Sequence, residues 1–267
     1  MRLRRTAAIA LRQFYLMRGS PARVVPVFTW AAIDIVLWGF ITRYLNSVAS
    51  PGFNFVPSIL GAVLLWDLLT RVLHGVTMAF MEDVWSRNFL NFFATPLSTW
   101  DYLAGLVLSS IGTSLITLVV ILVLATVLFG LSFFAYGAML IPFLLVLFLF
   151  GIAMGIGGAA LVLRFGPASE WFIWPIPALI SPLAAVYYPV ATLPRAMQYA
   201  ARLIPPSYVF EGMRAIVARR EVPGDQLALG VVLAAIDVLL ACWIFVRVYR
   251  SAVRTGLIAR YSAESVS

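Results

Sequence analysis

Long apolar stretches alternate with short polar ones along this chain. A bilayer core of about 30 Å needs about 20 apolar helical residues for each crossing. The pattern therefore predicts an all-α, polytopic membrane protein, a single transmembrane domain over residues 1–267 with six transmembrane helices. The six apolar stretches cover residues 24–44, 57–80, 102–129, 136–163, 171–190 and 227–248.

The first 23 residues form a basic segment with a regular apolar stripe. Its apolar positions are spaced four, three, four and three residues apart, which is typical of one face of a helix lying in the membrane interface. A signal peptide is the alternative, but Arg12 and Arg18 interrupt the apolar region that it requires. We therefore expect an amino-terminal interfacial amphipathic helix. The stripe consists of Leu3, Ala7, Ala10, Phe14 and Met17.

A shorter amphipathic segment, residues 82–96, separates the second and third apolar stretches. Aromatic residues from Trp85 to Phe93 fall on one helical face, while Asp83 and Arg87 fall on the other. Pro96 is expected to end this helix. The segment is either a helix that contacts a partner or a connector that rests on the membrane surface.

Six prolines from Pro167 to Pro194 interrupt the fifth apolar stretch and its flanks, and proline breaks the hydrogen bonding of a helix. If this stretch crosses the membrane, twelve arginines lie on the side of the amino terminus and five on the other. If it dips in and returns, the counts are thirteen and four, so charge does not choose between six and five spans. Residues 191–226 predict short helical pieces, at 195–203 and 209–220, that cap or re-enter the membrane.

Composition supports the membrane assignment and excludes several kinds of chemistry. Hydrophobic residues make up 63% of the chain and charged residues 11%, and all 19 basic residues are arginine. Without lysine the chain has no Walker A loop, so any ATP-driven work must be done by a partner. The net charge of +8 fits basic loops beside spans better than nucleic-acid binding. With one histidine (His74) and one cysteine (Cys242), no metal cluster or disulfide forms within one chain.

Five ionisable residues lie inside the apolar stretches, where an unpaired charge is costly. Asp67 and Arg71 are four residues apart and His74 follows three later, so all three project from one helical face. They are either an ion pair that fixes helix packing or groups that contact substrate or gate a pathway. The glycines in 151–158 indicate close helix packing within the protomer or, alternatively, a dimer contact. The five intramembrane polar residues are Asp34, Asp67, Arg71, His74 and Asp237.

The order of these elements, together with two local motifs, resembles the type-2 ABC exporter permeases. Arg87-Asn88, followed by aromatic and aliphatic residues up to Ala94-Thr95-Pro96 and then by Asp101-Tyr102-Leu103-Ala104-Gly105, is similar to the cytoplasmic coupling segment of that family. The second motif resembles the paired external re-entrant helices of the family. It comprises Tyr188-Pro189 through Leu193-Pro194, Leu203-Ile204-Pro205-Pro206-Ser207-Tyr208 and Glu211-Gly212-Met213-Arg214.

The resemblance assigns roles to two groups of residues. For contact with an ATPase it implies a coupling helix at 82–96 that contains Glu82, Asp83, Trp85, Arg87, Asn88, Phe89 and Pro96. For the external re-entrant segment, at 191–226 and its start, it implies Pro189, Pro194, Pro205, Pro206, Tyr208, Glu211 and Arg214. One departure is that the family often has acidic residues in the middle of the coupling helix, where this chain has Leu90-Asn91.

The resemblance also implies a function and a location. The expected protein is a non-enzymatic permease subunit of an exporter in the bacterial inner membrane, with six spans and both termini cytoplasmic. It forms a homodimer that works with two ABC ATPase subunits, which bind ATP and Mg; the chain itself needs no cofactor and contacts lipid but no nucleic acid. The alternatives are an ion-coupled secondary transporter that uses Asp67, Arg71 and His74, and an intramembrane enzyme acting on lipid. The sequence does not select a substrate.

Overall fold

The computed structural model describes residues 2–48, 56–86, 95, 97–131, 133–218, 221–222 and 224–256. All of the regular structure in these ranges is helical. Five helices are long and apolar enough to cross a membrane. They are α2 (Pro21–Val48), α3 (Gly61–Trp85, preceded by the π-helical turn η1, Val56–Leu60), α5 (Thr99–Phe129), α6 (Leu140–Phe165, preceded by the 3₁₀ turn η2, Phe133–Met139) and α11 (Gly224–Arg254).

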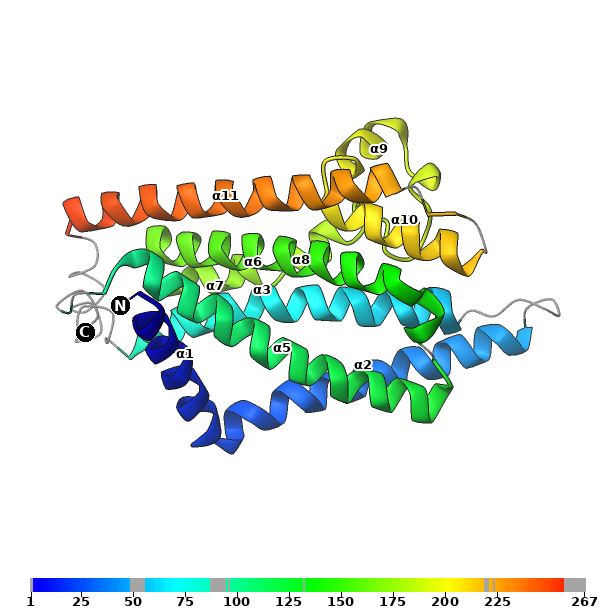
Figure 1. Ribbon diagram of the computed structural model, residues 1–267, viewed down its shortest axis with the longest axis horizontal. Helices are drawn as coiled ribbons and strands as arrows, with labels where there is room; N and C mark the ends of the chain where they lie inside the picture. Colours follow the sequence, from blue (N-terminus) through cyan, green and yellow to red (C-terminus); the bar gives the residue numbers. More distant parts are fainter. Residues whose placement is uncertain are drawn as a thin grey trace.

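Helices α3 and α6 form the centre of the bundle, with α5 and α11 packed around them and α2 at its margin (Figure 1). One core cluster joins the first half of α3 to α6 and to Phe210, and a second joins the other half of α3 to α5, α6 and Phe245. Local sequence sets the helix ends: Ser98 accepts a hydrogen bond from the Asp101 backbone N–H at 3.1 Å and so caps α5. Gly130, at φ +67°, ends the same helix in the left-handed conformation.

The amino-terminal helix α1 (Arg2–Arg18) lies at an angle across one end of the bundle (Figure 1). It packs against α5, where Ile9 and Gln13 are buried. Leu3 and Phe14, from the predicted apolar stripe, are 87% and 55% exposed. The stripe therefore faces away from the protein, as an interfacial helix with its apolar face toward lipid requires.

The predicted span at residues 171–190 is not one continuous helix in the structure. It follows the 3₁₀ turn η3 (Pro167–Ser169) and contains most of helix α7 (Glu170–Ile173), helix α8 (Ile176–Ile180), non-helical turns and the first residue of a 3₁₀ turn at Val190. The prolines explain the breaks, because each removes a helical hydrogen-bond donor and clashes with the preceding turn. Five long apolar helices, and not six, are therefore described.

The broken stretch nevertheless passes from one end of the bundle to the other. Trp174 stacks on His74, half-way along α3, with ring centroids 4.3 Å apart, and Tyr187 stacks on Trp38 of α2 at 5.4 Å. Val190 then reaches α10 at the far end, where α11 begins. The segment thus connects the end of α6 to the start of α11, which run in the same direction (Figure 1). We call residues 167–190 the broken crossing.

Short helices follow the broken crossing at the end of the bundle opposite α1 (Figure 1). They are the 3₁₀ turn η4 (Val190–Thr192), α9 (Arg195–Ala201) and α10 (Pro205–Val217). The two α-helices lie within the predicted pieces 195–203 and 209–220, except that α10 begins four residues earlier. Pro205 explains this earlier start, since proline is well accommodated in the first turn of a helix.

Candidate functional site

A buried charged cluster joins three helices at the end of the bundle where α1 lies. The Asp83 side chain, near the end of α3, has no exposed surface. Its Oδ1 lies 2.7 Å from Arg12 Nη1 of α1, and its Oδ2 accepts a 2.8 Å hydrogen bond from the Tyr102 hydroxyl of α5. Because a buried carboxylate is costly without partners, these two contacts fix α1 and α5 against the end of α3.

Two further ion pairs surround this cluster. Arg23 Nη1, at the start of α2, lies 3.3 Å from Glu82 Oε2, and Arg5 Nη1 of α1 lies 4.0 Å from Asp101 Oδ2. The pairs therefore involve both helices that flank residues 87–96. We call Arg5, Arg12, Arg23, Glu82, Asp83, Asp101 and Tyr102 the basal cluster.

The basal cluster corrects the start of the predicted coupling helix. Glu82, Asp83 and Trp85 belong to the last turns of α3, and so do not begin a separate helix. Asp83 is fully buried and cannot contact a docked subunit, whereas Trp85 is 49% exposed. The rest of the predicted helix, including Arg87, Asn88, Phe89 and Pro96, lies outside the described residues, so its structure stays a prediction.

Half-way along α3, Asp67 and Arg71 form the predicted pair. Arg71 Nε donates to Asp67 Oδ2 at 2.6 Å, and Arg71 Nη2 donates to Asp67 Oδ1 at 3.1 Å. His74 faces the same side but contacts the Trp174 ring, and its buried Nε2 has no hydrogen-bond partner among the described residues. A proton relay through all three residues is therefore not connected by hydrogen bonds.

The two remaining intramembrane acids lie on other helices. Asp34 of α2 interacts electrostatically with Arg71 and with Asp67, so it belongs to the same polar region. Asp237 of α11 has no charged partner among the described residues. The structure therefore groups four of the five predicted intramembrane residues and separates Asp237 from them.

The small-residue face of α6 packs directly against α3. A Cβ placed on Gly151 would lie 2.9 Å from Val72 Cβ, and one on Gly155 would lie 2.7 Å from Val76 Cβ. Thr77 Oγ1 of α3 also donates to the Gly155 carbonyl at 3.1 Å. The glycines are therefore used for close packing within the protomer, which was the first of the two predicted uses.

At the opposite end of the bundle, α10 holds the broken crossing by side-chain contacts. Glu211 Oε1 accepts hydrogen bonds from the Val190 backbone N–H at 2.7 Å and from Arg214 Nη2 at 2.9 Å. Arg214 Nη1 donates to the Val186 carbonyl at 3.3 Å. Burial lowers the pKa of the Arg214 guanidinium, and Glu211 opposes that shift. Both predicted residues thus position the segment that returns toward α11.

The other predicted residues of this segment mark the ends of its helices. Pro189 precedes η4, Pro194 precedes α9, and Pro205 and Pro206 open α10. The Tyr208 hydroxyl donates to the Arg202 carbonyl at 2.7 Å, and burial raises the pKa of that hydroxyl. These contacts make residues 189–217 a compact cap with defined bends.

Sequence reasoning did not identify four of the contact residues. Arg12 was treated only as part of a basic stripe, and Tyr102, Trp174 and Tyr187 were not assigned to any polar site. Each of these contacts joins two different elements of the fold. The one available signal for Arg12 and Tyr102 was an acidic residue, Asp83, at the end of an apolar stretch.

Comparison with known proteins identifies the family. The family described as ABC-2 type transporter matches residues 5–218, which include most of α1, all residues of the basal cluster and the cap formed by α9 and α10. The chain belongs to the ABC-2 type transporter family. No curated protein matches the sequence.

This ABC-2 protein is therefore a transport subunit of the membrane and not itself an enzyme. Its family generally works with ABC ATPase partners, and its apolar helices agree with a multi-pass membrane protein. The absence of lysine, and with it of a Walker A loop, fits this division of labour.

Proposed function

We propose that the chain is the permease subunit of an ABC exporter in the bacterial inner membrane. Two copies form the translocation pathway, and two separate ATPase subunits dock on the cytoplasmic segment that begins at Trp85 and continues through residues 87–96. ATP and Mg bind to the ATPases, whereas this chain needs no cofactor. Six passages, five helical and one broken, place both termini in the cytoplasm.

The basal cluster is the observation that carries this proposal. It joins both helices that flank residues 87–96 to the arginines of α1 and α2, α3 through Asp83 and Glu82 and α5 through Asp101. Tyr102 of α5 is also hydrogen-bonded to Asp83 of α3. A push on residues 87–96 therefore moves α1, α3 and α5 as one body. Such rigid-body movement is how ATP binding and hydrolysis, in another subunit, favour alternate arrangements of a transmembrane dimer.

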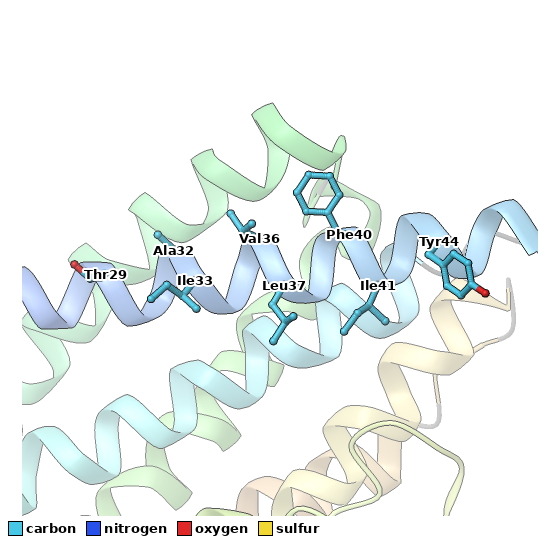
Figure 2. A pocket seen from close by; sticks show the side chains of 8 residues that line it. All are labelled: Thr29, Ala32, Ile33, Val36, Leu37, Phe40, Ile41 and Tyr44. Carbon is cyan, nitrogen blue, oxygen red and sulfur yellow. The ribbon is translucent and has the colours of Figure 1, made fainter.

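The exposed side of α2 supports a homodimer. An apolar groove of about 820 Å³ lies along this helix, and no described part of the chain fills it. Figure 2 shows its lining side chains projecting from two sides of α2. In the proposed dimer the second copy covers this groove. Its lining consists of Thr29, Ala32, Ile33, Val36, Leu37, Phe40, Ile41 and Tyr44.

The distribution of arginines supports the proposed orientation. Helix α1 and the last turns of α11, with Arg247, Arg250 and Arg254, lie at the same end of the bundle (Figure 1). Arginine enrichment beside spans marks the cytoplasmic side. Export driven by ion coupling is less favoured, because Arg71 already binds both carboxylate oxygens of Asp67 and His74 is hydrogen-bonded to neither.

Affinity purification tests the function. The tagged chain, expressed in its own host and extracted in mild detergent, is expected to recover an ABC ATPase subunit and Mg-dependent ATP hydrolysis. Replacing Trp85 by Ala should reduce recovery of the ATPase about 30-fold at unchanged membrane abundance, since truncating a buried aromatic anchor costs about 2 kcal/mol. Trp243→Ala is the matched control, because Trp243 is similarly exposed, at 58%, but lies on α11.

Two results would contradict the proposal. Recovery of the wild-type chain without any ATPase would remove the ABC partner. Equal ATPase recovery by the Trp85 and Trp243 variants would remove Trp85 from the docking surface.

A further inference from the structure

Ionisable groups from two helices meet at half depth in the bundle. Asp34 is the fourteenth of the 28 residues of its span, and Asp67 is the twelfth of the 30 residues of its own. Both side chains are only partly buried within the chain. Charged groups at this depth avoid lipid and face either a hydrated space or other protein. The side of the protomer between α2, α3 and the broken crossing therefore faces a hydrated space or other protein.

The charges on this face do not balance. Arg71 donates hydrogen bonds to both carboxylate oxygens of Asp67. It is also the positive charge that interacts electrostatically with Asp34. Asp34 itself makes no hydrogen bond and no ion pair with any described residue. Asp34 and Asp67 thus share one arginine, and a second copy would double this excess of negative charge.

Aromatic rings flank the unpaired carboxylate and its neighbours. Trp38, one turn beyond Asp34, is stacked on Tyr187 with an interplanar angle of 13°. Trp174 covers His74 on the adjoining side. Tyr187 and Trp174 remain 41% and 49% exposed, so each offers ring surface to a ligand. Aromatic faces attract cations, and more strongly where water is excluded.

We propose that this face binds a hydrophobic organic cation, which is the substrate class of the exporter. The Asp34 carboxylate supplies the charge that the cation needs, while Tyr187 and Trp174 contact its apolar body. His74 has no hydrogen-bonding partner at its buried Nε2 and packs behind Trp174. The transport of such a cation rests on the function proposed above, but its binding is a property of this chain alone.

Equilibrium binding of tetraphenylphosphonium to the full-length chain in lipid nanodiscs tests the site. Tetraphenylborate has the same shape with the opposite charge and serves as the ligand control. We expect saturable binding of the cation. Asp34→Asn and Trp174→Leu should each bind it about tenfold more weakly, since a lost charge or ring contact of about 1.4 kcal/mol is a tenfold loss of affinity. The anion should show no saturable binding.

Asp237→Asn is the matched variant, because Asp237 is also an unpaired intramembrane carboxylate but lies on α11, away from this face. It should bind the cation as the wild type does, and Asp34→Glu should retain most of the affinity. If Asp34→Asn does not fold, Asp34→Glu and Trp174→Leu decide. Absence of saturable cation binding, equal affinity for both ions, or wild-type affinity in Trp174→Leu would overturn the proposal. Recovery of the ATPase would be unaffected by these results, so the two proposals fail separately.

Discussion

Adding one methyl group at Gly155 should destabilise the protein by about 1–3 kcal/mol, which is the scale of overpacking in a filled interface. The new Cβ would lie 2.7 Å from Val76 Cβ and 2.9 Å from the Leu73 carbonyl oxygen of α3. Ordinary carbon contacts are about 3.5–4.0 Å, so α3 and α6 would have to separate by roughly 1 Å. The hydrogen bond from Thr77 to the Gly155 carbonyl would lengthen as well.

Gly157 provides the control on the same helix. A Cβ at Gly157 meets no atom within 4 Å among the described residues, so Gly157→Ala should be neutral or stabilising by up to about 1 kcal/mol through helix propensity. The same gain in propensity acts at Gly155, and the difference between the two variants therefore isolates the contact with α3.

Thermal unfolding in detergent, followed by size-exclusion chromatography of the heated samples, measures this difference. We expect Gly155→Ala to lose its monodisperse peak at a lower temperature than the wild type, and Gly157→Ala to lose it at the same or a higher temperature. Equal stability of the two variants would refute the close packing of α3 on α6.

Three other perturbations test separate parts of the structure. Tyr102→Phe leaves Asp83 without one donor and should reduce stability by about 1–3 kcal/mol in the same unfolding assay; an unchanged transition would show that the basal cluster is not formed. Asp67→Asn or Arg71→Gln alone should cost about 3–5 kcal/mol, and both together less, so additive losses would exclude the pair. A cysteine at Arg202 in an otherwise cysteine-free chain should react with an impermeant thiol reagent from the periplasmic side, and labelling from the cytoplasm alone would reverse the proposed orientation.

Hydrophobic patterning was enough to predict the five long apolar helices of the described structure. Each of these stretches is apolar over 20 or so residues, and helices of that length form whatever their partners are. The fifth stretch has the same composition but not the same structure, because mean hydropathy does not register that prolines such as Pro175 and Pro177 interrupt hydrogen bonding. Composition therefore predicted that residues 171–190 enter the membrane, and proline chemistry determined how.

The sequence predicted contacts between residues of one helix, but it did not predict contacts between residues of different helices. The pair between Asp67 and Arg71 follows from a spacing of four, which is local geometry. The contact of Arg12 with Asp83 and Tyr102 depends on how α1 crosses the bundle, and the stacking of Trp174 on His74 depends on the path of the broken crossing. Neither arrangement has a period that can be read along the chain.

The ion pairs of the basal cluster give the arginines at the start of the chain a second role. In the orientation proposed above, Arg5, Arg12 and Arg23 are synthesised before the carboxylates of α3 and α5, and act during insertion as positive charges that hold their segment on the side of synthesis. Once Asp101 has emerged, the same three arginines can be paired. In this orientation, the arginines that orient the nascent chain also stabilise the finished fold through their ion pairs. Helix α1 can therefore take its final position only after the first turn of α5 has been synthesised.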